Sequence, residues 1–560
     1  MFTAIRWTRR SHGALAAVLA GAAVFLGACG GGSSDSGTTA GNAQSGNAGG
    51  SSAQGRSTQG NGILTIAVTS PVATLNPALL NANPSYLWMD ELAYDSLIRY
   101  EQDGSYRPGL ATKFGYVGSG NEKFELTLRP DVKFADGTPV DAAAVAASLQ
   151  YAFKTGTSGP VRAPNFRTAK ATGPRSVLIS CSGPCPALPL LLSQSGNVGS
   201  IISPAGLRDK KALASRSFGA GPYVLNTKET VGGDHYTYDA NPGYWNKSGV
   251  HYKRVVVRIV SGSNARIAAL KSGQADIIDY VPLQQAKTVT TGGLKILPEP
   301  SGVVGVLLRD RTGRRSEGDP PGSIYAPQLA NPLVRKALSY AIDRKTLTSS
   351  FGYGYVTPSD QWTSPSAGGY DPSLEGRYAY DPKKAKALLA QAGYPNGFTL
   401  KVLSQKTNGN DSWQLAINQY WEAIGVKVQL KDTPDLTTFF ANAPIYPVVD
   451  NQYGAGSLTY AVEVYDYYSR GGWTNGYVPD PKITKMIAQA SAAPAEEAQQ
   501  IYLDINRYAV ENAFNIGIGQ LSYLFAYNSS KVVVPMCPKP SGVGKSVNCA
   551  PILTDVKAPE

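Results

Sequence analysis

The stretch Leu128-Arg129-Pro130-Asp131-Val132-Lys133-Phe134-Ala135-Asp136-Gly137-Thr138-Pro139-Val140 carries the clearest local structure signals in this chain of 560 residues. Its Asp136-Gly137 pair is a turn signal, because Gly adopts backbone conformations that other residues avoid. Asp141 follows directly and can cap the Ala-rich helix after it. The stretch therefore predicts a turn and then a helix that begins behind Asp141.

Strand and helix signals alternate on both sides of this stretch. The β-rich run Ile63–Val68 predicts a first strand, and the alternating β-branched run 254–260 predicts another. Residues 264–271 predict a helix, and residues 275–280 predict a further strand. The alternation continues along the chain without a repeat of fixed period. It predicts an α/β protein whose sheets are covered by helices.

A strong helix start lies further along the chain. Asn331-Pro332 has the form of an N-cap followed by proline at the first helical position. Behind it, apolar residues recur at helical spacing, namely Val334, Ala337, Leu338, Ala341 and Ile342.

The stretch 128–140 is one of a series of blocks. The others are Thr74-Leu75-Asn76-Pro77-Ala78, Gly219-Ala220-Gly221-Pro222-Tyr223, Asn241-Pro242-Gly243-Tyr244-Trp245 and Val334-Arg335-Lys336-Ala337-Leu338-Ser339-Tyr340-Ala341-Ile342-Asp343-Arg344. In the order and spacing of these blocks over nearly all of residues 62–530, the chain resembles extracellular solute-binding family 5 of bacterial ABC importers, the peptide/nickel-binding group. The resemblance implies a two-lobed periplasmic-binding-protein fold of type II with an additional inserted domain.

The resemblance also implies a division of the chain. A discontinuous first lobe is expected at 62–93, 215–305 and 515–560. An inserted domain is expected at 94–214, and a second lobe at 306–514. A signal peptide at 1–28 and a flexible Gly/Ser/Asn linker at 29–61 precede them, because this low-complexity tract has too little apolar surface to fold.

The N-terminal stretch indicates export. Arg6, Arg9 and Arg10 precede an apolar run at 13–26, and small residues end it, as in a secretory signal. The ending Leu26-Gly27-Ala28-Cys29 resembles the lipobox of bacterial lipoproteins, in which the cysteine is acylated. An ordinary signal peptide or an uncleaved anchor are the alternatives. We expect a lipoprotein anchored through Cys29 on the periplasmic side or the outer face of the cell membrane.

Charge gives little further information about partners. The formal charge is +12, and loss of the three signal arginines leaves +9. A basic exported protein can favour an anionic surface, although a solvated surface explains the same charge. No Lys/Arg cluster suggests nucleic-acid binding.

The cysteines fit an oxidising compartment. Besides Cys29 they form two local pairs, Cys181/Cys185 and Cys537/Cys549, which predict two disulfides. A Cys-x3-Cys pair without nearby histidine has poor spacing for zinc. The mature chain holds two histidines, His235 and His251, so no metal site and no cofactor are predicted.

Catalytic motifs are absent from the sequence. It has no Gly-x-Ser-x-Gly elbow and no His-Glu-x-x-His zinc motif. Gly544-Lys545-Ser546 resembles the end of a phosphate loop, but Lys539 stands where that motif needs its first glycine. An exported enzyme acting on a small polar substrate remains the rival class, and the non-repetitive α/β pattern disfavours an adhesion or scaffold protein.

The resemblance therefore implies a receptor rather than an enzyme. A monomer would capture a small solute by closure of its lobes and deliver it to a membrane permease with a cytoplasmic ATPase. A short peptide is the first expectation for the solute, and a sugar, a nickel chelate or another polar solute stays open.

Five residues are candidates for solute contact. The family often has a Trp-x-Ala-Asp-like stretch late in the chain, whose acid can meet a peptide amino group, whereas here the region contains Asp450, Asn451 and Tyr453. Asn76 follows the first predicted strand. Trp362 lies in a loop after the block 334–344 and could stack on the solute. For each of these residues, a satisfied turn or core position is the alternative.

Overall fold

The first strand shows why this chain forms a sheet covered on both faces. In the computed structural model, β1 (Ile63–Val68) pairs in parallel with β10 (Arg254–Ile259) and with β11 (Ile277–Ile278). Leu64 and Ile66 point into one apolar core, and Ala67 points into another. Side chains alternate between the faces of a strand, so two covered faces give the nearly continuous apolar run seen in the sequence.

The structure describes residues 62–80, 84–290, 292–308, 321–406, 410–454, 480–539, 543, 545, 547 and 552–559. Cys29 and the predicted signal and linker lie outside these residues. Gly60–Glu560 forms one compact unit. The three-part division of this unit stays a prediction.

Within the described residues, most strands join one large sheet. Its order is β15-β14-β16-β12-β17-β11-β1-β10-β9-β8, with β13 beside β17, and a separate sheet has the order β4-β5-β7-β6. The strands are β1 Ile63–Val68, β2 Ile98–Tyr100, β3 Tyr106–Pro108, β4 Ala111–Tyr116, β5 Lys123–Leu128, β6 Phe166–Gly173, β7 Ser176–Cys181, β8 Tyr223–Leu225, β9 His235–Ala240, β10 Arg254–Ile259, β11 Ile277–Ile278, β12 Leu294–Leu308, β13 Val356–Pro358, β14 Phe398–Gln405, β15 Val426–Thr433, β16 Val448–Gly454 and β17 Ile516–Asn528.

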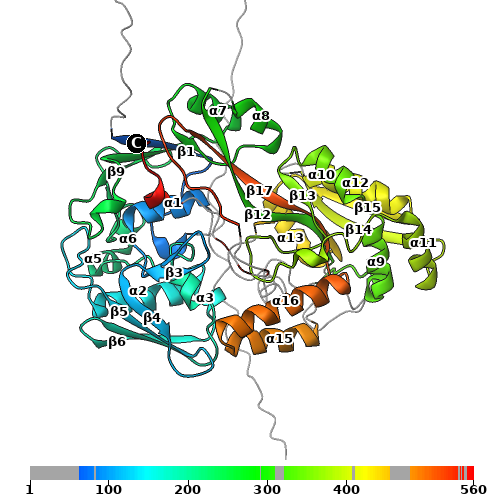
Figure 1. Cartoon of the computed structure of the whole chain (residues 1–560), viewed down its shortest axis with the longest axis horizontal. Coiled ribbons are helices and arrows are strands. Elements are labelled where there is room, and N and C mark those ends of the chain that lie inside the picture. Colours follow the sequence, from blue (N-terminus) through cyan, green and yellow to red (C-terminus); the bar gives the residue numbers. More distant parts are fainter. Residues whose placement is uncertain are drawn as a thin grey trace, which may run out of the picture. The chain divides into compact units, whose positions relative to one another are not determined.

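Helices cover both ends of the large sheet and one face of the smaller one (Figure 1). None of the helices in the described ranges has the length and hydropathy needed to span a membrane. They are α1 Pro84–Ala93, α2 Ala142–Thr155, α3 Gly159–Arg162, α4 Leu188–Leu191, α5 Pro204–Arg208, α6 Lys210–Leu213, α7 Ser263–Lys271, α8 Ala286–Val289, α9 Pro332–Tyr340, α10 Arg344–Phe351, α11 Pro382–Gln391, α12 Asn410–Glu422, α13 Leu436–Asn442, α15 Pro481–Ala492 and α16 Ala495–Glu511.

Two long strands, β12 and β17, cross from one end of the large sheet to the other. They pair antiparallel over most of their length and lie side by side in Figure 1. Their register shifts between Glu299 and Gly302 and again between Val304 and Gly305. Each shift is a bulge that bends the ladder. Gly305 is required there, because a Cβ atom would lie 2.3 Å from the carbonyl oxygen of Ile516.

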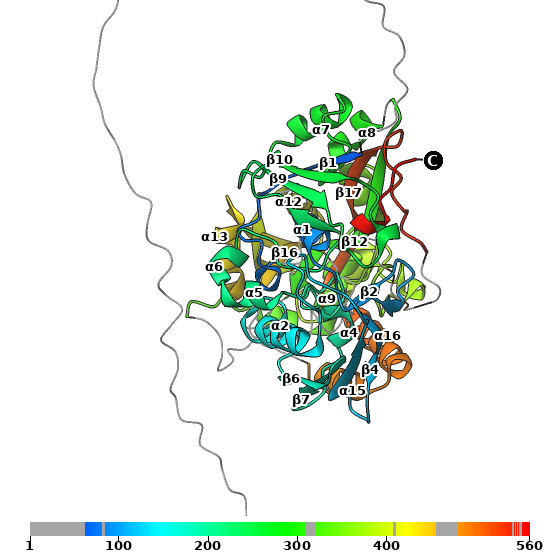
Figure 2. The ribbon, with the colours of Figure 1, turned by 90° about the vertical axis from the view of Figure 1, so that its left-hand side faces the viewer.

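The smaller sheet is built around the stretch 128–140. Gly137 has φ +83°, and the side chain of Asp141 caps α2 by accepting from the amide of Ala144 at 2.8 Å. The predicted turn and helix are therefore confirmed. Figure 2 shows α2 beside β6 and β7. Buried apolar residues of these three elements belong to one core cluster.

Other local predictions can be compared in the same way. Asn331 caps α9 through the amide of Leu333, as Asn331-Pro332 predicts. The strand predicted over 275–280 is only two residues long, Ile277–Ile278, because the chain turns away at Asp279. Pro222 leads into β8, and Gly221 is needed because a Cβ atom would lie 2.4 Å from the carbonyl carbon of Ala93.

The disulfide Cys181–Cys185 is present, as predicted. Cys537 is also disulfide-bonded. Its predicted partner, Cys549, lies outside the described residues, so that pairing stays a prediction. In the parts of the chain that the structure describes, no three His, Cys, Asp or Glu side chains group in a way that could hold a metal ion.

Candidate functional site

The carboxyl ends of parallel strands are the usual position for a ligand in an open α/β sheet. In the large sheet, β1, β10 and β11 run in parallel and end beside one another. Asp279 follows β11 directly and is fully buried. Its Oδ2 accepts from the amide of Thr69 at 3.0 Å, and its Oδ1 accepts from the Thr69 hydroxyl at 2.8 Å. This carboxylate therefore joins the loops that follow β1 and β11.

Arg266, on α7, joins the third loop to the other two. Its Nε lies 3.3 Å from Asp279 Oδ1, and both side chains are buried. Its Nη1 donates to the carbonyl oxygens of Val260 at 2.7 Å and Ser261 at 2.8 Å. Its Nη2 donates to the carbonyl oxygen of Tyr280 at 3.1 Å. Burial lowers the pKa of Arg266, and the Asp279 charge opposes this effect. The guanidinium keeps all three loop ends in one arrangement.

Tyr280 directly follows Asp279, and its backbone is held by the hydrogen bond from Arg266. Its φ is +43°, a left-handed conformation that costs a non-glycine residue about 1–2 kcal/mol and that often occurs at functional sites. Its ring meets the ring of Tyr523, on β17, edge to face at a centroid distance of 5.9 Å. Both tyrosines are half-buried. The site therefore lies where β11 meets the crossing of β12 and β17.

A carboxylate lies beside these two rings. Glu299 is buried at the first register shift of β12, opposite Tyr523 in the ladder. Burial, followed by the charge of Glu299, raises the pKa of Tyr523 to about 12. Burial, the neighbouring Tyr523 and Glu299 raise the pKa of Tyr280 in the same way. The rings of Tyr280 and Tyr523 and the carboxylate of Glu299 therefore form one group of side chains. This group of side chains was not identified in the sequence, although Tyr280 is the last residue of a predicted strand.

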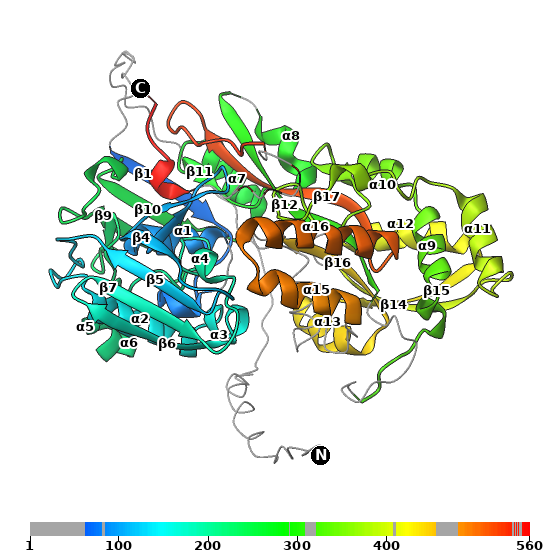
Figure 3. The ribbon, with the colours of Figure 1, turned by 60° about the horizontal axis from the view of Figure 1, so that its bottom comes forward.

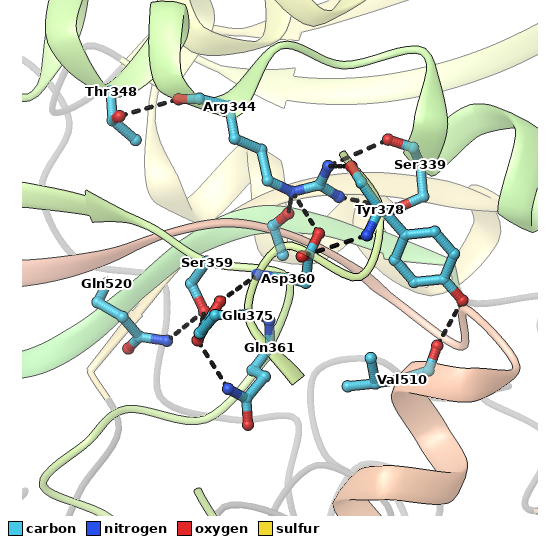
Figure 4. Close-up of polar contacts among 11 residues, drawn as sticks. Ser339, Arg344, Thr348, Ser359, Asp360, Gln361, Glu375, Tyr378, Val510 and Gln520 are labelled. Carbon is cyan, nitrogen blue, oxygen red and sulfur yellow. Dashed lines mark hydrogen bonds and ion pairs between the residues drawn. The ribbon is translucent and has the colours of Figure 1, made fainter. Parts of the chain in front are cut away.

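Further along β17, near Gly517, a buried ion pair holds the segment 359–378 (Figure 4). Arg344, at the start of α10, lies 3.1 Å from Asp360 and donates to the hydroxyl of Ser339 at 2.7 Å. It also donates to the carbonyl oxygen of Gly517, on β17, at 2.7 Å. Burial lowers the pKa of Arg344, and the carboxylate of Asp360 opposes this effect. The pair ties α10, the segment and β17 together.

Glu375 completes this network. Its carboxylate accepts from the Ser359 hydroxyl at 2.7 Å, from the Asp360 amide at 2.9 Å and from the Gln361 side chain at 2.7 Å. Gln520, on β17, donates to Ser359 Oγ at 2.8 Å. Figure 4 shows these side chains converging on one turn of the segment. The network is a rigid support, and Trp362 follows it directly in the chain.

Three of the predicted contact residues are buried. Asn76 caps a short 3-10 helix, Pro77–Leu79, and donates to the hydroxyl of Tyr151 at 2.7 Å. Trp362 packs in an apolar cluster with side chains of α15 and α16, such as Ile487 and Ile505. Asp450, on β16, accepts from the hydroxyl of Ser404, on β14. These contacts lead to three different parts of the fold.

The other two predicted residues have a known backbone position. Asn451 pairs with Gly305, and Tyr453 pairs with Val303, in the ladder between β16 and β12. Their side chains lie outside the described residues. The contact of all five residues with a solute stays a prediction.

Residues 105–490 match the family described as "Bacterial extracellular solute-binding proteins, family 5 Middle". The chain belongs to this family. The glutathione-binding protein GsiB of Escherichia coli K12 is 28% identical over 380 residues, which are 66% of this chain and 69% of the relative.

Solved structures of the same fold agree with this membership. The periplasmic binding protein DppA from Helicobacter pylori, in complex with the peptide STSA, aligns with a TM-score of 0.68 at 18% identity and covers 89% of this chain and 98% of its own. NikA from Staphylococcus aureus, in complex with Ni(L-His)2, aligns with a TM-score of 0.66 at 16% identity. The alignment covers 89% of this chain and 100% of the NikA chain. The two-lobed type II fold expected from the sequence is therefore confirmed.

Family membership establishes the class of function. The chain is an extracytoplasmic solute-binding receptor of an ABC importer, and not an enzyme. The receptor binds a small solute and works with a membrane permease.

Proposed function

We propose that this receptor binds a short peptide and that Glu299 recognises its ammonium group. The observation that carries the proposal is the position of Glu299 opposite Tyr523, whose ring meets the ring of Tyr280 at the carboxyl end of β11. A buried carboxylate favours a cation, and tyrosine rings offer both apolar faces and hydroxyl groups to a peptide. The relatives add support, because one is named as a glutathione-binding protein and a structural neighbour holds the peptide STSA.

The solute would lie between the predicted lobes, and the bulges of β12 near Glu299 would be the point at which the lobes turn. Ligand can favour the closed form only as far as it binds that form better than the open form. Arg266 and Asp279 would act by holding Tyr280 in place. The network formed by Arg344, Asp360 and Glu375 would hold the segment 359–378 in place in the predicted second lobe.

Within this proposal, the residues predicted from the sequence take two roles. Asn451 and Tyr453 stay candidate solute contacts on β16. The burial of Asn76, Trp362 and Asp450 favours supporting positions behind the site. Lipid anchoring through Cys29 and a monomeric state are also part of the proposal.

The solute class can be tested with defined probes. Mass spectrometry of solute that co-purifies with the native protein identifies the class, and calorimetry with trialanine, reduced glutathione, a nickel–histidine complex and maltotriose measures preference. We expect a peptide to be found and to bind. A sugar or a nickel chelate found in its place would contradict the peptide proposal.

The role of Glu299 has a sharper test. Glu299→Gln removes the charge, so binding of trialanine should weaken by about 2–5 kcal/mol, since the ammonium group loses its buried partner. N-acetyltrialanine lacks that charge and should bind the variant and the native protein equally. Glu125→Gln, an exposed acid on β5, is the matched control. Equal trialanine affinity in Glu299→Gln and the native protein would exclude Glu299 from recognition.

A further inference from the structure

One side chain joins two distant parts of the chain outside the proposed solute site. Asn121 lies in the turn between β4 and β5 of the four-stranded sheet. Its Nδ2 donates to the carbonyl oxygens of Ser491 at 3.0 Å and Ala493 at 2.9 Å, across a sequence separation of about 370 residues. Both acceptors lie at the end of α15. Figures 1 and 3 both show α15 and α16 next to the elements of this sheet.

The chemistry of this contact is specific. The last carbonyl groups of a helix have no partner within the helix and need a donor from elsewhere. A side-chain amide carries two N–H groups and can satisfy two such oxygens at once. Asn121 therefore completes the C-terminus of α15 from another part of the fold. All three residues are half-buried, so the contact is partly shielded from water.

The disulfide shapes the turn that carries Asn121. The amide of Cys181 donates to the carbonyl oxygen of Glu122 at 2.8 Å, and the amide of Cys185 donates to that of Asn121 at 2.9 Å. The covalent bond between the two cysteines closes the loop that makes both contacts. Asn121 itself has φ +54°, a left-handed conformation that asparagine tolerates better than most residues. The loop thus fixes the direction in which the amide points.

A further hydrogen bond joins β4 to the disulfide loop. The hydroxyl of Tyr116, on β4, donates to the carbonyl oxygen of Cys185. Burial raises the pKa of Tyr116, and Tyr502, on α16, adds to this effect. The disulfide loop therefore supports the turn through which the four-stranded sheet contacts the end of α15.

We propose that Asn121 is a latch that stabilises the packing of the four-stranded sheet against α15 and that the disulfide Cys181–Cys185 makes this latch redox-sensitive. The latch rests on the proposed closure of the receptor, because it joins the predicted inserted domain to the predicted second lobe. It requires no particular solute. A thiol reductant can open the disulfide by thiol–disulfide exchange: Cys181 and Cys185 gain two electrons and two protons and become free thiols, and two reductant thiols are oxidised to a disulfide. Loss of the bond loosens the turn that carries Asn121, and the closed arrangement becomes less favourable relative to the open one.

The latch is tested by measuring a distance in the full chain without added solute. Spin labels introduced as unnatural amino acids at Lys170, on β6, and Lys485, on α15, leave every cysteine untouched, and both positions are exposed. Asn121→Gly keeps the left-handed backbone and removes both hydrogen bonds. Because each of the two bonds contributes about 1 kcal/mol, we expect the ratio of short to long distances to fall about 30-fold.

Asp131→Gly is the matched control, because Asp131 is exposed, lies outside this contact and has φ +59°. It should leave the distance distribution unchanged. An Asn121→Gly protein that melts like the native protein and keeps the native distance distribution would overturn the latch. Since no solute is added, failure of the peptide proposal does not affect this result.

The redox part has its own test. Cys181→Ser combined with Cys185→Ser should lower the ratio of short to long distances in the same direction as Asn121→Gly. The same pair of changes should have no further effect in the Asn121→Gly background, because the disulfide acts through that side chain. If the double serine variant keeps the native ratio of short to long distances, the redox sensitivity is overturned. It is also overturned if the double change lowers this ratio equally in the native chain and in Asn121→Gly.

Discussion

Asp90, on α1, is an acid held in an apolar environment. It is buried, and its Oδ2 accepts from the hydroxyl of Ser200 at 2.5 Å. Burial raises its pKa to about 7, and the Ser200 hydrogen bond opposes part of this shift. The carboxyl group borders a small cavity lined by Val72, Leu75, Leu80, Met89, Ala93, Tyr94, Ser217 and Tyr238.

The raised pKa of Asp90 makes the free energy of unfolding depend on pH. Because the pKa is higher in the folded chain than the ordinary value of 3.8, the folded state binds more protons than the unfolded state between about pH 4 and pH 7. The contribution of Asp90 to the free energy of unfolding is full below about pH 4 and is lost as the pH rises through about 7.

Asp90→Asn removes this titration. Between about pH 5 and pH 8, the native protein should lose about 2–3 kcal/mol more of its free energy of unfolding than the variant loses. Urea unfolding at the two pH values measures the difference. Asp131→Asn, an exposed change, should follow the native protein. Parallel pH profiles for the native protein and Asp90→Asn would show that burial does not shift this group.

At the scale of elements, β17 is the strand on which the two ends of the large sheet depend. It pairs with β12, β11 and β13, and the segment 359–378 lies against it. Gly517 permits that approach. A Cβ atom there would lie 2.6 Å from the carbonyl oxygen of Gln361 and 2.8 Å from the carbonyl carbon of Asp360. Backbone cannot give way as a flexible side chain can, so this strand tolerates no side chain at 517.

Gly517→Ala should therefore destabilise the fold by about 1–3 kcal/mol, as overpacking does elsewhere in protein cores. Denaturant unfolding, monitored by circular dichroism, measures the change. Gly115→Ala, on β4, is the matched control, because its Cβ atom would meet no heavy atom within 4 Å. Its stability should stay within about 0.5 kcal/mol of the native value. A Gly517→Ala protein as stable as Gly115→Ala would show that the segment can move aside.

At the scale of the whole molecule, a receptor of an ABC importer has to stay near its permease. The chain carries a lipobox-like Leu26-Gly27-Ala28-Cys29 and a low-complexity tract behind it. Both lie outside the described residues.

Cys29→Ser removes the thiol that the proposed anchor needs. The variant should lose lipid label and either leave the membrane fraction or accumulate as uncleaved precursor. Metabolic labelling with a fatty acid and fractionation of cells measure both effects. A cysteine pair in the folded unit is the control: Cys181→Ser with Cys185→Ser should stay labelled. Lipid label retained by Cys29→Ser would contradict the anchor.

Local features of this protein were predictable from the sequence, because their physical cause lies within a few residues. Asp141 caps the helix that follows it, and Asn331 does the same for α9. The order of the blocks also predicted the family. Burial was not predictable in this way, since Trp362 and Asp450 lie in loops or strands whose neighbours come from other parts of the chain.

Contacts between distant segments were decided by the tertiary structure. Glu299 and Tyr523 meet Tyr280 only because β12 and β17 cross beside β11. Asn121 meets the end of α15 across about 370 residues, and no local pattern marks either partner. Hydrogen bonds and apolar contacts act over a few ångströms in space. The sequence therefore determines the elements and their caps, whereas the packing of the elements decides which side chains form a site.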